Sequence, residues 1–450
     1  MKLQELENKT ILLFGKSRAF SPEEFASQML SHKIKIAKEF SDEVVLCVEG
    51  RMMTPYEQNA SDALYENKSI KSISIDLLER ALAEEIDADT LLMSLKLSHD
   101  KERLFTFIKN SMISDTLFFR LLYMYNWRGE DFFENDDNRD VTAALIGRFY
   151  ENIERNHNVQ YAALGLMHLV SQSKDEKLLE VIASLEPLQK SLNAEKNSAN
   201  FSILTAIAKH PKTPKSVLKV FAKKANTYLQ TLLAQRQDCD IQMQEQLFIN
   251  ADEQVFEALS CNSNLDKGIL KQLLNKEGFA KNIAQCISLD KELFALLFEK
   301  YALELAANVS LNLEMQEQLF ETNREEVKIS LATNVSIHEN MIKKLLHVES
   351  EKVKYALHVN KKTPHKFLQE AYKNAAFHEA LAKNTNTPQE LLLLLGKSEQ
   401  TEILEALAKN PSTPVEILYQ LQLNSKFERF VKENAAFGKH IQTQNIGWIV

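Results

Sequence analysis

Hydrophobic and polar positions divide the chain into a short first part with strands and a long remainder with helices. Two continuous apolar runs, Lys9–Gly15 and Glu43–Gly50, each end at a glycine, which is typical of buried strands in a mixed sheet. Ile34–Phe40 alternates between apolar and polar residues, and Ser69–Ile75 is a fourth strand candidate. A small sheet is therefore expected within the first 85 residues.

Helical segments separate these strands. Ser21 with Glu24, and Thr54 with Glu57, have the spacing of a capping box, which predicts a helix after each pair. Another helix is expected from Ile75 onward. The predicted element order over residues 1–85 is β-α-β-β-α-β-α, a small α/β domain.

Residues 86–200 have apolar positions at helical spacing and are predicted to form a helical connecting domain. The loop 127–140 holds six acidic residues but lacks the spacing of a calcium-binding loop, so a solvated surface loop is expected. The polar stretch 189–201 fits two interpretations, a hinge or a degenerate early repeat.

An internal repeat occupies residues 201–450. Ala206–Leu218, Ala380–Leu392 and Ala406–Leu418 share one pattern, and the segment MQEQLF occurs twice, 72 residues apart. Each copy is anchored on the residue after its alanine-rich segment: His210, Arg236, Asn262, Cys286, Asn308, Asn334, Asn360, Asn384, Asn410 and, in a degenerate last copy, Asn434. A unit of about 25 residues cannot bury its own apolar faces, so the copies are predicted to stack into an α-solenoid with a C-terminal cap.

Each copy is expected to be a pair of short helices. The anchor asparagine is predicted to end the first helix in the left-handed conformation. Thr387 and Thr413 are predicted N-caps of the second helix, each followed by a proline at the first helical position, and Ser336 is expected to act similarly without proline. The anchors Asn262, Asn308, Asn334, Asn360, Asn384 and Asn410 are thus predicted to be structural residues.

The repeat pattern A-x-N-P-x-T-P-x-x-x-L resembles that of the leucine-rich-repeat variant family over about residues 210–434. That resemblance implies repeats in which an α-helix is paired with a shorter 3₁₀-like helix, wound into a right-handed superhelix. Thr-Pro is lost in the middle copies, where the resemblance is weaker.

The element order of about residues 6–85 resembles that of a BRCT-type domain, an α/β module used for protein and phosphopeptide recognition. In phosphopeptide-binding members a Ser or Thr precedes the glycine after the first strand, and a Lys opens the second helix. Phe14 and Tyr56 occupy those positions here, and the tryptophan usual in the last helix is missing. The resemblance therefore implies the fold without the phosphate-binding residues.

Composition agrees with a mainly α-helical fold, since the chain has only 10 Gly and 9 Pro. The formal net charge of −8 lies in the first part: residues 1–200 carry 24 basic and 33 acidic side chains, and residues 201–450 carry 30 and 29. Neither part is basic enough for general nucleic-acid binding. No apolar stretch reaches the length of a membrane span and no signal peptide is evident, so a cytoplasmic protein without membrane contact is expected.

Candidate chemistry is sparse. Lys16, Ser17 and Arg18 follow Gly15 and are candidate anion-binding residues, although a solvated loop is the favoured interpretation. Gly15–Ser17 does not belong to a P-loop, because Thr10 stands where the first glycine is required. Hydrolase, zinc-protease and dinucleotide motifs are missing from the sequence, so no enzyme activity, catalytic residue, cofactor or metal is predicted.

Cys239, Cys261 and Cys286 stand near the anchors of neighbouring copies. The favoured interpretation is that they are small buried apolar residues, and a thiol pair is the alternative. The histidines have no metal-ligand spacing. The apolar tail 445–450 is predicted to pack as the cap, with partner docking as the alternative.

These observations favour a non-enzymatic interaction or scaffold protein that binds a protein partner through its repeat surface and N-terminal domain. The alternative is a nucleic-acid-associated factor that uses the N-terminal domain and the lysine-rich run Lys212–Lys224, which contains no acidic residue. Salt-dependent retention on DNA separates the two hypotheses.

Overall fold

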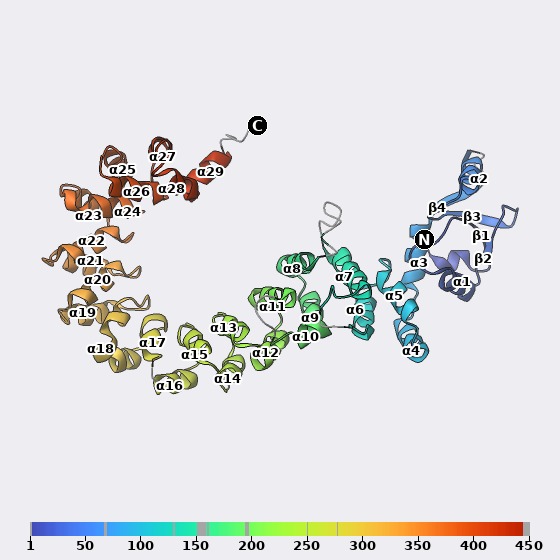
Figure 1. The fold of residues 1–450 in the computed structure, drawn as a ribbon, viewed down its shortest axis with the longest axis horizontal. Helices are drawn as coiled ribbons and strands as arrows, with labels where there is room; N and C mark the ends of the chain where they lie inside the picture. Colours follow the sequence, from blue (N-terminus) through green and yellow to red (C-terminus); the bar gives the residue numbers. More distant parts are fainter. Residues whose placement is uncertain are drawn as a thin grey trace. The chain divides into compact units, whose positions relative to one another are not determined.

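The computed structural model describes residues 2–66, 70–128, 131–150, 159, 162–193, 198–249, 251–276 and 278–443. The chain is mainly helical, with a four-stranded sheet near its N-terminus, and it divides into two compact units, Met1–Gln230 and Thr231–Val450 (Figure 1). The predicted mainly α fold class is therefore confirmed at this level.

The sheet of the first unit is parallel throughout. Its strands are β1 (Thr10–Phe14), β2 (Lys35–Ala37), β3 (Val44–Glu49) and β4 (Lys71–Ser74), in the spatial order β2-β1-β3-β4. Helix α1 (Pro22–Ser31) connects β1 to β2, and α2 (Pro55–Glu66) connects β3 to β4, as adjacent parallel strands require. The predicted element order is confirmed, whereas the expected mixed sheet is wrong.

The core of this α/β part is built on the two central strands. Leu12 and Phe14 of β1 pack with Val44 and Cys47 of β3, and α2 contributes Ala60 to the same cluster. These strands are covered by helices, which explains why their sequences are almost continuously apolar.

Both predicted caps form, and at Thr54 the two bonds of the capping box are both present. The Ser21 hydroxyl accepts a hydrogen bond from the Glu24 N–H at 3.2 Å and caps α1. At the start of α2 the Thr54 N–H donates to Glu57 Oε2 at 2.7 Å, and the Glu57 N–H donates to the Thr54 hydroxyl at 3.3 Å. Local sequence therefore sets where both helices begin.

The rest of the first unit is helical. A 3₁₀ turn, η1 (Leu3–Leu6), precedes the sheet, and the helices after it are α3 (Ile75–Glu84), α4 (Ala88–Ser98), α5 (Lys101–Lys109), α6 (Asp115–Met124), α7 (Asp136–Phe149), α8 (Ala163–Gln172), α9 (Glu176–Ser184), α10 (Glu186–Lys190), α11 (Ala199–Lys209) and α12 (Lys215–Lys224). Helix α13 (Thr227–Ala234) lies across the boundary between the units.

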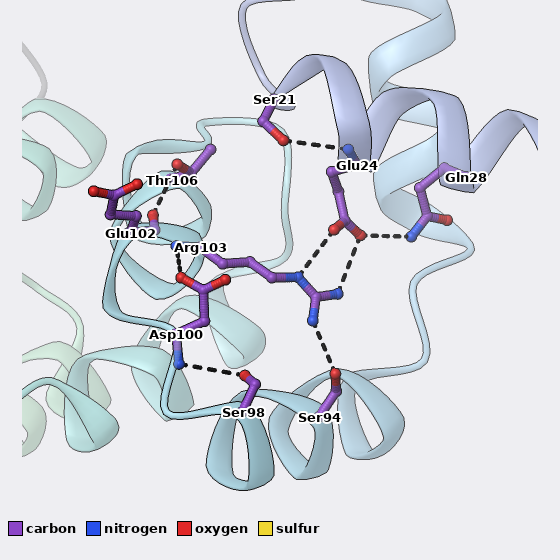
Figure 2. Close-up of polar contacts among 9 residues, drawn as sticks. All are labelled: Ser21, Glu24, Gln28, Ser94, Ser98, Asp100, Glu102, Arg103 and Thr106. Atoms are coloured by element: carbon purple, nitrogen blue, oxygen red, sulfur yellow. Dashed lines mark hydrogen bonds and ion pairs between the residues drawn. The ribbon is translucent and has the colours of Figure 1, made fainter.

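A polar network joins the α/β part to the helices that follow it (Figure 2). The Arg103 guanidinium on α5 donates to both carboxylate oxygens of Glu24 on α1, at 3.0 and 3.4 Å, and to the Ser94 hydroxyl of α4 at 2.8 Å. The rings of Phe20 and Phe107 pack edge to face beside it, 6.3 Å apart. The Glu24 side chain is only 12% exposed, so this ion pair is better shielded than a surface pair.

The acidic loop 127–140 is not the solvated surface loop that the sequence predicts. Trp127 and Phe132 are buried and their rings meet edge to face at 5.1 Å. From Asp136 onward the segment is already helix α7, capped by Asn135, whose side chain accepts from the Asn138 N–H. Apolar residues within the acidic run therefore anchor it; Gly129 and Glu130 lie outside the described residues.

The second unit is a succession of short helices that follow one another in sequence order (Figure 1). They are α14 (Ile241–Ile249), α15 (Glu253–Ser260), α16 (Lys267–Leu274), α17 (Ala280–Cys286), α18 (Lys291–Ala306), α19 (Leu313–Glu321), α20 (Glu325–Thr333), α21 (Glu339–Leu346), α22 (Glu351–Val359), α23 (His365–Ala371), α24 (His378–Lys383), α25 (Gln389–Leu395), α26 (Thr401–Lys409), α27 (Val415–Gln422), α28 (Glu428–Glu433) and α29 (Ala435–Thr443). Helix α18 is two helices joined at a kink at Tyr301.

Helices one copy apart pack against each other: α20 on α22, α22 on α24, α24 on α26 and α26 on α28. Both helices of each copy are α-helices in the described part of this unit, and a single 3₁₀ turn, η4 (Ala375–Phe377), precedes α24. The alternation of α and 3₁₀ helices that the family resemblance implies is therefore not the geometry found here.

Candidate functional site

The loop after β1 was the candidate anion-binding segment, and Gly15 begins it with a left-handed backbone, φ +72°. A Cβ at this position would lie 2.5 Å from the Arg51 carbonyl oxygen, so only glycine fits. Lys16 then pairs with Arg51 through two backbone hydrogen bonds of 2.7 and 2.8 Å. The loop is therefore held against the segment that follows β3.

A carboxylate of the chain occupies the centre of this loop. Glu79, on α3, is only 1% exposed, and its Oε1 atom accepts hydrogen bonds from the Ser17 hydroxyl (2.8 Å), the Arg18 N–H (2.8 Å) and the Ala19 N–H (3.1 Å). The Ser17 hydroxyl in turn accepts from the Phe20 N–H at 3.1 Å. The donors proposed for an external anion are thus engaged by an internal one.

A second carboxylate accepts from the first N–H of the loop. The Gly15 N–H donates to Glu57 Oε1 at 3.1 Å. Hydrogen bonds from the Thr54 N–H, the Gly15 N–H and the Thr54 hydroxyl lower the pKa of the Glu57 carboxyl. The side chains of Lys16 and Arg18 are exposed. Among the four candidate residues, the Gly15 and Arg18 N–H groups and the Ser17 hydroxyl thus donate to the protein's own acids, and the Lys16 N–H donates to the Arg51 carbonyl oxygen.

A cleft of about 570 Å³ lies beside this loop, between the α/β part and helices α5 to α7. Three of its four basic side chains are paired: Arg51 with Asp76 at 2.8 Å, Lys109 with Asp140 at 2.5 Å, and Arg148 with Asp115 at 2.7 Å; Arg18 is the fourth. An anionic ligand entering here would have to displace these carboxylates. The lining holds four basic side chains and three acidic ones, Asp76, Glu79 and Asp140, so its excess of positive charge is small.

The anchor asparagines form a ladder of buried side-chain hydrogen bonds, called here the asparagine ladder. Its members in the second unit are Asn262, Asn308, Asn334, Asn360, Asn384, Asn410 and Asn434, all at most 6% exposed. In Asn384 the side-chain N–H groups donate to the carbonyl oxygens of His358 (2.8 Å) and Asn360 (2.9 Å), both in the preceding copy. Its Oδ1 accepts from the Asn386 N–H at 2.8 Å.

The same three bonds recur from copy to copy. Asn410 donates to Ala382 and Asn384 at 2.7 and 3.1 Å and accepts from the Ser412 N–H at 2.8 Å. The other members repeat the scheme with their own preceding copy. Each asparagine therefore fixes the spacing and register of two successive helices.

The physical role predicted for these residues needs correction. Asn334, Asn360, Asn384 and Asn410 end their helices with an extended backbone, φ between −64° and −77°, and not in the left-handed conformation. The predicted anchor Cys286 is also displaced by one residue, because Asn308 donates to the carbonyl oxygen of Ile287. Asparagine is thus used for its side-chain amide, which both donates and accepts.

The threonines of Thr-Pro are not N-caps. The hydroxyls of Thr363, Thr387 and Thr413 are buried and donate to the carbonyl oxygens of Leu357, Leu381 and Leu407, six residues earlier. The following proline, and not the threonine, holds the cap position of the next helix. Ser336 is likewise not a cap, since α21 is capped by His338.

Two buried glutamines that the repeat pattern did not indicate as functional link copies lacking Thr-Pro. Gln244 donates to the carbonyl oxygens of Cys239 and Asn264, both at 2.9 Å, and accepts from the Asp266 N–H. Gln316 makes the corresponding bonds to Leu311, Ser336 and His338. Both stand in the repeated MQEQLF segment, and that exact recurrence was the signal for them.

The cysteines and histidines fall into separate environments. Cys239 is buried, as the favoured interpretation expects, whereas Cys261 is exposed and Cys286 half-buried, so that interpretation is wrong for Cys261; Cys47, in the first unit, is buried. His358 is buried, and burial lowers its pKa to about 4. His157 and the apolar tail 445–450 lie outside the described residues.

Within the described residues, the structure contains no group of three or more His, Cys, Asp or Glu side chains placed to hold a metal ion. In that same part of the chain, no helix is both long and apolar enough to cross a membrane. Comparisons of the chain with protein families, with curated proteins and with solved structures found no match.

Proposed function

We propose that the chain is a non-enzymatic, cytoplasmic interaction protein that binds a protein partner through an α-solenoid of repeated helices, with its N-terminal domain as a second contact. The observation that carries this proposal is the asparagine ladder. Because the copies anchored on Asn360, Asn384, Asn410 and Asn434 are each bonded to the preceding one in the same way, exposed side chains at one repeat position come into a regular row there. The resemblance of the repeat pattern to the leucine-rich-repeat variant family agrees with a solenoid.

One part of this row forms a shallow groove of about 300 Å³ between α24 and α26, called here the charged groove. It is lined by Glu379 and Lys383 of one copy and Glu405 and Lys409 of the next, paired at 2.6 and 2.5 Å. Lys383 also donates to the Tyr355 hydroxyl at 3.0 Å, one copy earlier. The pairs hold their side chains in place and offer both signs of charge to a ligand.

The charge balance of the groove favours a protein segment over a polyanion. Glu402 adds a third carboxylate to the lining, so acidic groups outnumber lysines there. The phosphates of a nucleic acid would be repelled by these acids, whereas a peptide with mixed charges can pair with both kinds of side chain. A nucleic acid bound near Lys212–Lys224 remains the alternative hypothesis, as an outcome of the experiment below.

The experiment is an affinity capture from the lysate of the host organism, with the tagged full chain as bait and nuclease present or absent. The test variant is Lys383→Glu with Lys409→Glu, which reverses two charges in the charged groove. The matched control is Glu390→Lys with Glu416→Lys, two reversals at exposed positions of the second helices in the same copies.

A nuclease-resistant protein that is captured by the wild type and the control, and lost with the groove variant, supports the proposal. Capture that is equal for all three chains contradicts the groove as the binding surface. Loss of all captured material with nuclease, together with retention on DNA that falls steeply with salt, replaces the proposal by the nucleic-acid alternative.

A further inference from the structure

Two cysteines occupy equivalent places in successive copies of the second unit. Cys261 follows the last residue of α15, directly before Asn262, and Cys286 is the last residue of α17, directly before Ile287. Ile287 is the anchor position of its copy, as Asn262 is of the preceding copy, because the Ile287 carbonyl oxygen accepts from Asn308 as the Arg236 carbonyl oxygen accepts from Asn262. Helices α15 and α17 pack against each other.

The asparagine ladder is interrupted at this step. Ile287 has no side-chain amide, so it cannot donate to the copy that contains Asn262. A different bond links the two copies: the Asn282 side chain donates to the Ser260 hydroxyl at 3.1 Å. Ser260 directly precedes Cys261, and Asn282 lies one helical turn before Cys286 on the same face of α17. This bond therefore brings the two thiols to the same point of the interface.

The thiols are in contact with each other and with solvent. Burial, then the hydrogen bond between the two thiols, raise the pKa of Cys286 to about 11. Cys261 is exposed, whereas Cys47 and Cys239 are buried. A reagent in solution therefore reaches Cys261 first, and Cys286 is the thiol next to it.

We propose that Cys261 and Cys286 are a redox modification site, which a two-electron oxidant of the peroxide class closes to a disulfide. The Cys261 sulfur attacks one peroxide oxygen, the O–O bond breaks, and a sulfenic acid and the first water form. The Cys286 sulfur then attacks the Cys261 sulfur, the S–O bond breaks, and a second water leaves. The two thiols lose two electrons and two protons, which the peroxide takes up; a thiol reductant reverses the reaction.

The disulfide would take the place of the missing ladder bond. It joins the ends of α15 and α17 across a loop of about 25 residues, and such a cross-link restricts the unfolded chain. Oxidation can thus cross-link two copies at a step where the anchor is not asparagine. Oxidised protein is expected to melt at a higher temperature than reduced protein.

The first test is oxidation of the full chain with hydrogen peroxide, followed by N-ethylmaleimide, cleavage after glutamate and mass spectrometry. Cleavage after glutamate separates all four cysteines, with Cys261 in 258–277 and Cys286 in 278–292. The expected product is a cross-link between these two peptides within one chain. Cys261→Ser and Cys286→Ser must each abolish it, while Cys47 and Cys239 stay unmodified in the folded protein.

The second test needs no oxidant. Phenylarsine oxide bridges two adjacent thiols through arsenic and releases one water, so it reports their proximity directly. Wild type is expected to retain it and each serine variant to lose it, with unchanged circular dichroism spectra. The proposal is overturned if Cys261 is oxidised while Cys286 stays open to maleimide, if the cross-link joins two chains, or if the arsenical binds a serine variant equally well.

Discussion

Replacing Asn384 by alanine tests the asparagine ladder at a fully buried rung. The substitution removes the hydrogen bonds to the carbonyl oxygens of His358 and Asn360, at 2.8 and 2.9 Å, and the bond accepted from the Asn386 N–H at 2.8 Å. The Asn360 carbonyl oxygen still accepts a hydrogen bond from the Thr363 N–H, so it loses only one of its two partners. The His358 carbonyl oxygen and the Asn386 N–H lose this partner, the first in a buried residue and the second in a half-buried one.

The expected cost follows from these three bonds. A net hydrogen bond contributes about 1 kcal/mol, and a buried polar group left unpaired costs about 1–3 kcal/mol. Asn384→Ala should therefore lower the free energy of unfolding of its part of the array by about 3–5 kcal/mol. Asn384→Asp should cost at least as much, because a carboxylate supplies no donor for the two carbonyl oxygens.

The assay is urea unfolding followed by circular dichroism, together with hydrogen exchange of the amides in α22 and α24. The matched control is Asn386→Ala, a half-buried residue whose side chain donates to the Thr363 carbonyl at 3.0 Å, and it should cost about 1 kcal/mol. If Asn384→Ala and the control unfold at the same urea concentration, the ladder does not hold the copies together and the structural interpretation fails.

Three further predictions concern separate parts of the chain. His358 is held neutral, because burial lowers its pKa from 6.5 to about 4. Between these pH values unfolding takes up a proton, so the free energy of unfolding should fall by about 3 kcal/mol from pH 7 to pH 4. A His358→Leu variant whose stability falls with the same slope over this pH range would contradict the prediction. Glu79→Ala leaves three loop donors without their acceptor and should destabilise the first unit by about 3 kcal/mol, with partial rescue by inorganic phosphate that the wild type does not show in thermal melting. Arg103→Met should cost about 1–2 kcal/mol, and a double-mutant cycle with Glu24→Gln that gives no coupling would refute a stabilising pair.

Much of the first unit could be predicted from sequence because its signals are local. The apolar runs ending at Gly15 and Gly50, and the capping boxes at Ser21 and Thr54, depend only on nearby residues, and the corresponding elements form. Whether the strands pair parallel depends on contacts between residues far apart in sequence, such as Ile11 with Leu46, and the apolar pattern does not distinguish a mixed sheet from a parallel one.

The same limit applies to the candidate sites. The positions of the asparagines indicated where each copy ends. The bonds that their side chains make could not be predicted, because the acceptors lie in the preceding copy. The loop at Gly15–Arg18 has the donors of an anion site, and only the fold shows that Glu79, about 60 residues later, fills it. Phe132 shows the converse error, since an acidic neighbourhood concealed a core residue.

The bonds between copies in the asparagine ladder are all donated by the later copy to the earlier one. This direction determines which copies can be added or removed without leaving a donor unpaired. Each asparagine carries the donor and finds its acceptors in the copy before it. A gene segment duplicated in frame therefore inserts a copy that brings its own donor and offers the next one an acceptor. Deleting copies from the C-terminal end leaves every remaining donor satisfied, whereas a deletion on the N-terminal side leaves a buried amide with no acceptor.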